Sequence, residues 1–361
     1  MTATVIGVGQ MGQAIAWGME SLGHDLLLVD TNKKSIDLCK KTVENPDKHL
    51  FKLISTDPLS YNSKYEYDFL NDSSVVISSL PYHQNLELAS HCIDNNIKYC
   101  DLGGKVEVSD TINQYAKSHA TAPVATDLGL APGWVNILAE GMYNDHVREN
   151  NGTPPESIEM MVGGLPASPT NSLKYGCTWS YDGLINEYRD NCVVLRNGMK
   201  SIEQGMEGLV DVDTDIGNLE AFYTSGGAAH TISIMQKRGV QNCSYKTLRY
   251  PGHQNMIKFL IRECGLDDKT LISIFKKTCP PPRDDVVIIR VQIDDRVQEK
   301  VIRSDGKFSA MQQATAFPVA VMSSLVSQER FSRNVLKYDD IPYPQFNKLV
   351  TGLLSRNALS L

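Results

Sequence analysis

The chain lacks three features that mark common classes of protein: paired cysteines, basic runs and long apolar runs. Its eight cysteines form no CxxC pair in 361 residues, and disulfide-dependent folds are small and secreted, so we expect reduced thiols. No apolar run approaches the roughly 18 residues that span a bilayer. The strand-like start TATVIGVG leaves no room for a signal peptide. These absences predict a cytoplasmic protein without a membrane partner.

Positive charge is also scarce. The formal net charge is -7, whereas nucleic-acid binders need clustered cationic side chains to displace counterions, so we expect no nucleic-acid partner. One acidic stretch, DVDTDIGNLEAF at 211–222, resembles a calcium loop. However, its glycine stands at the seventh place and Phe222 occupies the place of the bidentate glutamate. The sequence therefore predicts no metal site.

Two domains are the natural expectation for 361 residues that are 42% hydrophobic, since domains usually run about 100 to 200 residues. In the first third, short β-branched runs alternate with helical segments, which is typical of a parallel sheet with crossover helices. The expected strands are 3–7, 25–30, 74–79, 97–102 and 122–127, with a helix over 84–95. We predict an α/β fold in which residues 1–132 form a doubly wound Rossmann domain.

After residue 132, strand-like runs follow one another with fewer regular helices between them. These runs are 157–162, 192–196, 218–223, 244–250 and 286–293, the last of which starts an expected hairpin with its turn at residues 294–295. We predict an α+β substrate domain over 133–310, built on a largely antiparallel sheet. Helical spacing over 308–329 and 344–356 predicts C-terminal helices within 311–361 that pack back on the Rossmann domain.

A dinucleotide site is predicted after the first strand. Gly7, Gly9 and Gly12 form G-x-G-x-x-G between a strand and a helix in VIGVGQMGQAIA. The first glycine permits the tight turn, the second lets the backbone approach a pyrophosphate, and the third lets helix and strand pack closely. Asp30 ends the second strand, where a carboxylate would meet the ribose hydroxyls and repel a 2′-phosphate. The predicted cofactor is therefore NAD.

Further cofactor contacts are expected at the carboxyl ends of the strands at 74–79 and 97–102, because ligands bind at this edge of open α/β sheets. The additional residues predicted to bind the cofactor are Gln10, Met11, Ser79, Leu80, Pro81, Asp101, Leu102 and Gly103.

Two residues are candidates for proton transfer. Asp127 heads DLGLAPGWVN at the last strand of the first domain, where we expect its carboxylate to face an interdomain cleft; capping the helix that starts near Pro132 is the alternative. His230, in TSGGAAHTI, stands before an expected helix and is either an acid–base group or a structural polar group.

Substrate contacts are expected around the Pro-Gly turn in SYKTLRYPGH, residues 244–253. Arg249 can form a bidentate pair with a carboxylate, and Tyr250 and His253 stand beside it. A solvated surface arginine is the other interpretation. Glu187, in LINEYRD, is a further candidate with the same two interpretations, substrate binding or structure.

Several motifs occur in a consistent order: VIGVGQMGQAIA, SSLPYHQNLELA, YCDLGG, DLGLAPGWVNILA, GGLP, YDGLINEY, LEAFYTSGG and YKTLRYPGH. Together they resemble the lysine 6-dehydrogenases, within the saccharopine dehydrogenase-like superfamily, over about residues 4 to 320. Trp134 stands where relatives often carry a smaller apolar residue, and GGAAH around His230 replaces a Ser/Thr-rich stretch. These departures leave the exact amine substrate open.

The resemblance implies a homodimer or higher homo-oligomer and an amino-acid substrate. It also implies NAD-dependent oxidative deamination of the ε-amino group of L-lysine, which releases ammonia and forms allysine, and allysine then cyclises to piperideine-6-carboxylate. The alternatives are a saccharopine or carboxynorspermidine dehydrogenase-type reaction and a non-catalytic NAD-binding regulator. A substrate with a second carboxylate would need a second cation, for which Arg189 and Arg283 are candidates.

Overall fold

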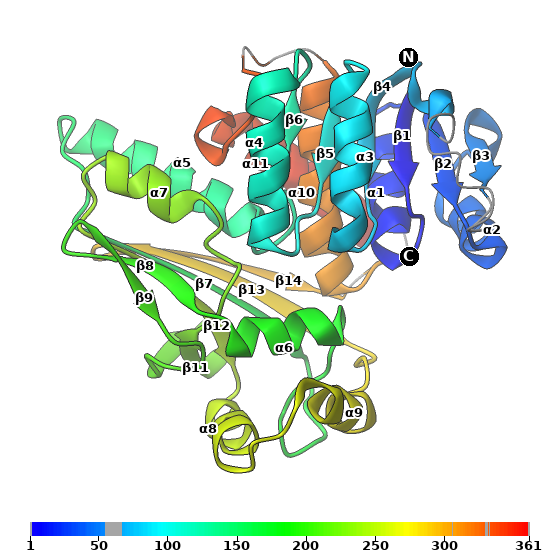
Figure 1. The fold of residues 1–361 in the computed structure, drawn as a ribbon. Coiled ribbons are helices and arrows are strands. Elements are labelled where there is room, and N and C mark those ends of the chain that lie inside the picture. Colours follow the sequence, from blue (N-terminus) through cyan, green and yellow to red (C-terminus); the bar gives the residue numbers. More distant parts are fainter. Residues whose placement is uncertain (1, 55–66, 305, 329–330, 332, 360–361) are drawn as a thin grey trace. The chain divides into compact units, whose positions relative to one another are not determined.

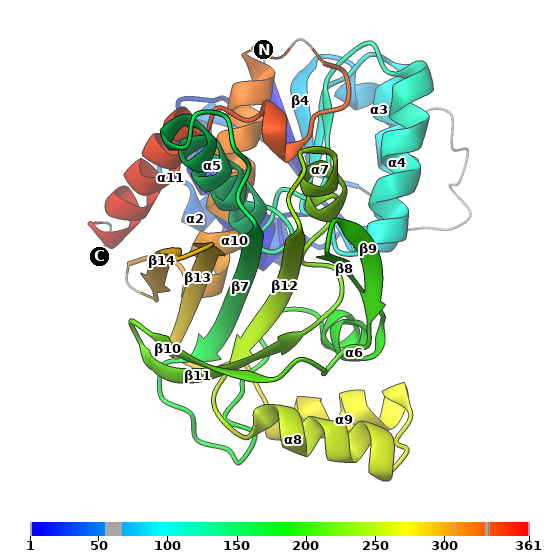
Figure 2. The ribbon, with the colours of Figure 1, turned by 90° about the vertical axis from the view of Figure 1, so that its left-hand side faces the viewer.

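The computed structural model describes residues 2–54, 67–304, 306–328, 331 and 333–359. The chain forms two compact units (Figures 1 and 2). Unit 1 combines residues 1–134 with 312–361, and unit 2 is the continuous segment 135–311. The chain therefore leaves unit 1 once, builds unit 2 and returns to unit 1.

Unit 1 is built on a six-stranded parallel sheet in the order β3-β2-β1-β4-β5-β6. Its strands are β1 (Thr2–Ile6), β2 (Leu26–Asp30), β3 (Leu50–Leu53), β4 (Ser73–Ser78), β5 (Tyr99–Asp101) and β6 (Val124–Ala125). The predicted doubly wound parallel sheet is confirmed. The sequence analysis missed β3, because this short edge strand exposes Leu50 and Leu53 and has no buried residue in its pattern.

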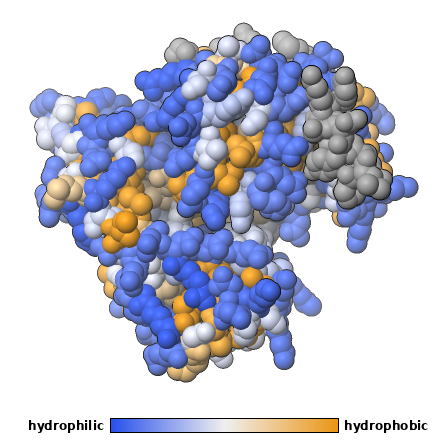
Figure 3. Space-filling model, in the orientation of Figure 1, coloured by the Kyte–Doolittle hydropathy of each residue, from blue (hydrophilic) through white to orange (hydrophobic). Residues whose placement is uncertain are grey.

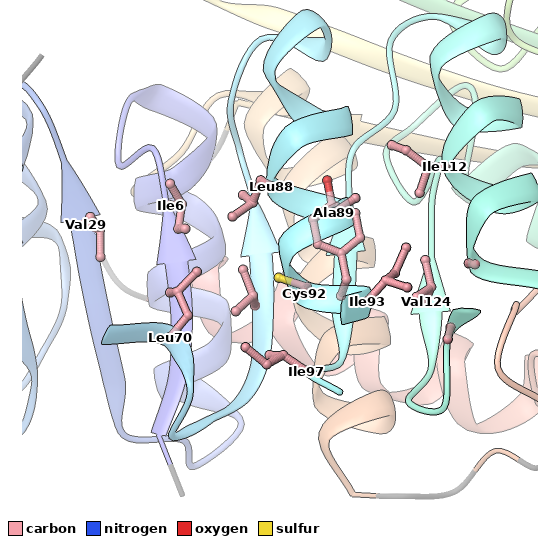
Figure 4. Close-up of a cluster of buried hydrophobic side chains, with 14 residues drawn as sticks. Ile6, Val29, Leu70, Leu88, Ala89, Cys92, Ile93, Ile97, Ile112 and Val124 are labelled. Atoms are coloured by element: carbon pink, nitrogen blue, oxygen red, sulfur yellow. The ribbon is translucent and has the colours of Figure 1, made fainter. Parts of the chain in front are cut away.

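Helices cover both faces of this sheet. Figure 1 shows α3 and α4 on one face, with α1 and α10 on the other. The helices of unit 1 are α1 (Gln10–Ser21), α2 (Lys33–Thr42), α3 (Tyr82–Asp94), α4 (Val106–His119), α10 (Ala310–Ser327) and α11 (Tyr343–Ala358). Under α3 and α4, a continuous apolar cluster joins Ile6, Leu88 and Ile112, each at most 3% exposed (Figure 4). This core fixes the strands whose carboxyl ends carry the predicted cofactor residues.

The C-terminal segment is part of unit 1. The ring centroids of Trp17 in α1 and Phe317 in α10 are 5.5 Å apart. Before α11, the chain extends the sheet beyond β6, because Val124 N donates to Asn334 O over 2.7 Å and Leu336 N donates to Val124 O over 2.9 Å. Segments from both ends of the sequence therefore complete one sheet.

Unit 2 contains a mixed, largely antiparallel sheet in the order β10-β11-β12-β7-β13-β14, with a β8–β9 hairpin joined to β12. Its strands are β7 (Ser157–Pro166), β8 (Cys192–Arg196), β9 (Met199–Glu203), β10 (Val210–Thr214), β11 (Gly217–Tyr223), β12 (Asn242–Arg249), β13 (Asp285–Ile293) and β14 (Arg296–Arg303). The predicted second sheet and the β13–β14 hairpin are confirmed, and β7 and β12 form a parallel pair within it. The acidic stretch 211–222 lies in the β10–β11 hairpin.

The helices of unit 2 lie at two ends of this sheet (Figure 2). They are α5 (Trp134–Glu149), α6 (Tyr181–Arg189), α7 (Thr231–Lys237), α8 (His253–Lys258), the π-helical turn η4 (Phe259–Glu263) and α9 (Asp268–Thr278). At one end, α6, α8 and α9 enclose a core that contains Tyr188, Phe222 and Phe275. Two of the predicted substrate residues, Arg249 and His253, contact aromatic rings of this core.

Hydrophilic residues dominate the face of the molecule in Figure 3, where hydrophobic residues gather in separate patches. Of the helices that the structure describes, none combines the length and the apolar character of a membrane span.

Candidate functional site

The glycine loop joins β1 to α1 in the geometry that a dinucleotide requires. Gly7 adopts a φ of +85°, and a Cβ at Gly12 would lie 1.9 Å from the Gly7 carbonyl oxygen. Residues with side chains would be strained at both positions. By contrast, a Cβ at Gly9 would meet no atom within 4 Å. Open space therefore adjoins the backbone where a pyrophosphate is expected.

The N-terminus of α1 presents amide donors at this open space. The first hydrogen bond of the helix runs from Gln13 N to Gly9 O, so the amides of Gln10, Met11 and Gly12 have no partner within the helix. No side chain caps the helix at Gly9, and its first turn carries no acidic residue. These predicted residues fit the phosphates of a dinucleotide.

Asp30 is fixed beside the glycine loop at the end of β2. Its Oδ2 accepts the backbone N–H of Val8 over 2.8 Å, and its Oδ1 accepts that of Asn32 over 2.7 Å. The carboxylate is only half-buried. This placement fits the recognition of a ribose next to the phosphate site.

The segments after β4 and β5 complete this edge of the sheet. Ser79 N donates to Ile6 O over 2.8 Å, and a Cβ at Gly7 would lie 2.9 Å from Ser79 O. Leu80 and Pro81 lead from Ser79 into α3, whereas Leu102 and Gly103 follow β5. The strand order reverses between β1 and β4, which is where ligands bind in doubly wound sheets.

Two buried aspartates meet beyond this edge. Asp101 is 0% exposed and Asp127 is 3% exposed. Asp101 Oδ1 accepts the backbone N–H groups of Gly103 over 2.9 Å and of Asp127 over 3.0 Å, and its Oδ2 accepts the Tyr99 hydroxyl over 3.1 Å. Protein donors therefore occupy the Asp101 carboxylate, and a direct contact with the cofactor stays a prediction.

Asp127 has fewer donors on its carboxyl group. Its Oδ1 accepts the Ser109 hydroxyl over 2.7 Å, whereas its Oδ2 lies 3.4 Å from the Thr126 hydroxyl. Its backbone has a φ of +62°, and its carbonyl oxygen accepts the Tyr338 hydroxyl over 2.9 Å. These contacts hold Asp127 between β6, α4 and the C-terminal segment, and they differ from a cap on α5.

Both carboxyl groups bind protons more tightly than usual. Burial raises the pKa of Asp101 to about 6 and that of Asp127 to about 7, and the negative charge of Asp101 adds to the shift of Asp127. Among the described residues, no cation pairs with either carboxylate. A carboxyl group that titrates near neutral pH can accept and return a proton, which is the chemistry predicted for Asp127.

His230 lies in unit 2 at the start of α7 and is partly exposed. Asn136 orders the loop before it, because Asn136 Nδ2 donates to Gly227 O and Ala228 O, each over 3.1 Å. The structure thus places His230 on an ordered loop, and its acid–base role stays a prediction.

Arg249 ends β12 and is 3% exposed, which excludes a solvated surface arginine. Its Nη1 donates to Thr247 Oγ1 over 2.7 Å and to Leu248 O over 2.9 Å, and its Nε donates to the Tyr188 hydroxyl over 3.3 Å. The guanidinium carbon lies 4.7 Å from the ring centroid of Tyr175. Nη2 is the guanidinium nitrogen for which the described residues provide no hydrogen bond.

His253 continues this network as a neutral histidine. Its Nδ1 lies 2.8 Å from Leu173 O, which can only accept, so Nδ1 carries the proton. Its Nε2 then accepts from the Tyr188 hydroxyl over 3.0 Å. Burial and the charge of Arg249 lower the pKa of His253 to about 3. Nδ1 therefore holds the ring on Leu173, and Nε2 orients the Tyr188 hydroxyl, which accepts from Arg249.

Glu187 is the acidic neighbour of Arg249. Its Oε2 lies 3.9 Å from Arg249 Nη2, which is an ion pair too long for a hydrogen bond. The side chain is 19% exposed, yet burial of the carboxyl group raises its pKa to about 7 against the opposing effect of Arg249. Tyr250 is directed elsewhere, because its hydroxyl donates to Pro166 O over 3.0 Å.

The structure thus brings Arg249, His253 and Glu187 together, with Tyr250 beside them. The sequence analysis did not single out Tyr175 or Thr247 as partners. Period-two alternation places Thr247 on the same face of β12 as Arg249 and could have found it. No local signal points to Tyr175.

Two family models match nearly the whole chain. The saccharopine dehydrogenase NADP binding domain matches residues 3–126, and the saccharopine dehydrogenase C-terminal domain matches residues 129–357.

Solved structures of two relatives share the fold. Apo saccharopine dehydrogenase (L-Glu forming) from Saccharomyces cerevisiae has a TM-score of 0.70 at 16% identity, covering 98% of this chain and 97% of that one. Homospermidine synthase from Legionella pneumophila, solved in complex with NAD, has a TM-score of 0.69 at 11% identity, covering 98% and 89%. The two family models occur in order along one chain with this fold, so the protein belongs to the saccharopine dehydrogenase family of NAD(P)-binding oxidoreductases.

Proposed function

We propose that the protein oxidises the ε-amino group of L-lysine: a hydride passes from the ε-carbon to NAD, water hydrolyses the resulting imine to allysine with release of ammonia, and allysine cyclises to piperideine-6-carboxylate with loss of water. The observation that carries this proposal is the pair of the buried Arg249 and the partly exposed Glu187, whose Nη2 and Oε2 atoms are 3.9 Å apart in unit 2. An α-amino acid carries a carboxylate and an ammonium side by side, and this pair offers one complement to each.

The α-carboxylate of lysine would bind at Arg249 Nη2. The other guanidinium nitrogens are held by Tyr188, Thr247 and Leu248, so the charge is fixed in place before substrate arrives. The α-ammonium would bind the Glu187 carboxylate. Together they orient the substrate so that its ε-amino end is the part that reacts.

Proton removal is the second requirement. The ε-ammonium of lysine has a pKa near 10.4, and its nitrogen must have a free lone pair before a hydride can leave the neighbouring carbon. Asp127, whose pKa burial raises to about 7, is the proposed acceptor, with His230 as the alternative. The bound nicotinamide supplies the hydride acceptor.

Asp30 supports NAD as the cofactor. Its carboxylate is fixed by the amides of Val8 and Asn32 at the ribose end of the glycine loop, and a negative charge there disfavours a 2′-phosphate. Calorimetric titration should therefore give tighter binding of NAD than of NADP, and Asp30→Asn should narrow the difference. If the unmodified protein bound NAD and NADP with equal affinity, the assignment of NAD as the cofactor would be wrong.

The activity is tested by following NADH formation with lysine, ornithine, saccharopine and carboxynorspermidine in turn. We expect lysine to react fastest. Cadaverine is the matched control, because it has the same amine chain as lysine without the α-carboxylate and should react poorly. Turnover of saccharopine alone would overturn the proposal.

A reaction of the saccharopine type is the second candidate, favoured by the names of both matching family models. Its substrate would bring further carboxylates and need another cation. Arg189 already pairs with Asp268 over 2.6 Å, whereas Arg283 is exposed.

A regulator without turnover is a further alternative. It would bind NAD and form no NADH with any of these amines.

We also propose that the protein forms a homodimer or higher homo-oligomer. Light scattering after size-exclusion chromatography would measure its molar mass in solution.

A further inference from the structure

Unit 1 buries two carboxyl groups, Asp101 and Asp127, next to each other. Two negative charges in a buried site repel each other, and burial itself disfavours charge. A fold that keeps such a pair needs either a cation or a proton. Since the described residues provide no cation here, the pair depends on a proton.

The backbone geometry ties the two residues together. One oxygen of Asp101, Oδ1, accepts the amides of both Gly103 and Asp127. Asp127 adopts a φ of +62° and Gly103 a φ of +77°. A Cβ at Gly103 would lie 2.2 Å from Asp127 Oδ1. The Asp101 carboxylate thus fixes two left-handed residues that pack against each other.

The donors around the pair are distributed unequally. Asp101 accepts three hydrogen bonds, from two amides and the Tyr99 hydroxyl, and bonds of this kind favour the charged form. The Asp127 carboxyl accepts one short bond, from Ser109 on α4. The C-terminal segment faces the pair with the neutral Tyr338, and α4 adds the negative charge of the exposed Asp110. Of the two carboxyl groups, Asp127 is therefore the one that binds the shared proton.

We propose that Asp101 is a positioning residue for Asp127: its carboxylate fixes the backbone of Asp127, and its negative charge makes Asp127 the carboxyl group that binds and releases the shared proton near neutral pH. The pairing of the two carboxyl groups stands on unit 1 alone. The use of that proton in turnover rests on the function proposed above.

Asp101→Asn tests the charge while it preserves the scaffold, because the amide oxygen of asparagine still accepts the two backbone N–H groups. With aspartate carboxyl groups labelled with carbon-13, NMR titration should show the Asp127 signal of the variant titrating about one pH unit or more below that of the wild type. The Asp127 signal is assigned by its loss in Asp127→Asn. Asp110→Asn is the matched control, and its shift should be smaller because Asp110 is exposed to solvent.

An unchanged Asp127 titration in a folded Asp101→Asn variant would overturn the proposal. If the variant does not fold, the wild-type titration decides, because the pair must then show two coupled steps between about pH 5 and 8. Ordinary titration of both groups near pH 4 would refute the shared proton.

Kinetics give a separate readout. The acidic limb of the pH profile of kcat/KM for lysine should move to lower pH in Asp101→Asn. This is the same direction as the shift expected for the Asp127 titration by NMR. A shift by NMR without turnover of any amine would leave the pairing intact and remove the proposed function. Lysine turnover without any shift of the Asp127 titration in Asp101→Asn would leave the proposed function intact and overturn the pairing.

Discussion

The buried charges of unit 1 and those of unit 2 have different kinds of neighbour. Asp101 and Asp127 are two like charges among hydroxyls and amides, whereas Arg249 is a single cation against the Tyr175 ring, with Glu187 at 3.9 Å. A carboxyl group can escape burial of its charge by binding a proton, but a guanidinium cannot lose one. Unit 1 therefore contains a carboxyl pair that titrates, and unit 2 contains a cation whose charge is permanent.

In the proposed reaction, this difference separates two tasks. A residue that moves protons must change its charge close to the working pH, while a residue that holds a substrate carboxylate must keep its charge. The surroundings match each task. The Oδ2 atom of Asp127 has only a long contact, with the Thr126 hydroxyl. Arg249 donates hydrogen bonds to Thr247 and Leu248 in β12 and to Tyr188 in α6.

Replacing the permanent charge should have the largest effect. Arg249→Met removes the hydrogen bonds to Tyr188, Thr247 and Leu248 inside a buried site, and each buried hydrogen bond to a charged group is typically worth about 1.5–3 kcal/mol. Urea denaturation should show that loss, and the KM for lysine should rise strongly. Affinity for NAD, measured by calorimetry, should be nearly unchanged because the glycine loop lies in unit 1.

Arg189→Met is the matched control for that change. Arg189 lies in the same helix as Tyr188 and forms an exposed ion pair with Asp268, so we expect a cost of about 0–1 kcal/mol. Equal stabilities of the two variants would mean that the buried hydrogen bonds of Arg249 do not stabilise the fold.

Gly103→Ala should disturb the carboxyl pair by geometry rather than by charge. A left-handed backbone costs an alanine about 1–2 kcal/mol, and the new Cβ would lie 2.2 Å from Asp127 Oδ1. Gly23→Ala is the matched control, because its φ of +91° gives the same backbone strain while its Cβ would meet no atom within 4 Å. Thermal unfolding should rank Gly103→Ala clearly below Gly23→Ala, and similar melting temperatures would contradict the close packing.

The pH dependence of stability should separate the two sites further. Burial raises the pKa of Asp127 from 3.8 to about 7, so the folded chain keeps a proton that the unfolded chain releases. The contribution of this proton to stability is fully present below pH 3.8 and is lost as pH rises through about 7. Unfolding free energies measured from pH 4 to pH 8 should fall less steeply in Asp127→Asn than in the wild type. Asp145→Asn, at an exposed acid of unit 2, should leave the slope unchanged.

The smallest effect is expected at Glu187. Glu187→Gln should raise the KM for lysine several-fold with little change in stability, because the ion pair with Arg249 is long. Since burial raises the pKa of Glu187 to about 7, lysine binding to the wild type should weaken as pH falls below 7, and the variant should lose this dependence. Asp182→Asn, at an exposed acid on the same helix, serves as the control.

Much of the fold could be predicted because its signals are local. Alternation of β-branched runs with helices predicted the parallel sheet, and G-x-G-x-x-G with Asp30 predicted the dinucleotide edge. The edge strand β3 gave no such signal. The contacts of the charged residues could not be predicted from local sequence, because Asp127 is held by Ser109 and by Tyr338, which is distant from it in the sequence. Arg249 likewise depends on Tyr175 and Glu187, which lie many residues upstream in other elements.

The backbone pairing of Val124 with residues 334–336 has a consequence for biosynthesis. A ribosome produces β6 long before the segment that covers its outer edge, because all of unit 2 is made in between. Until then the nascent Rossmann sheet has an unpaired strand open to other chains, and such edges promote aggregation. Completion of unit 1 must therefore wait for the last part of the chain to leave the ribosome.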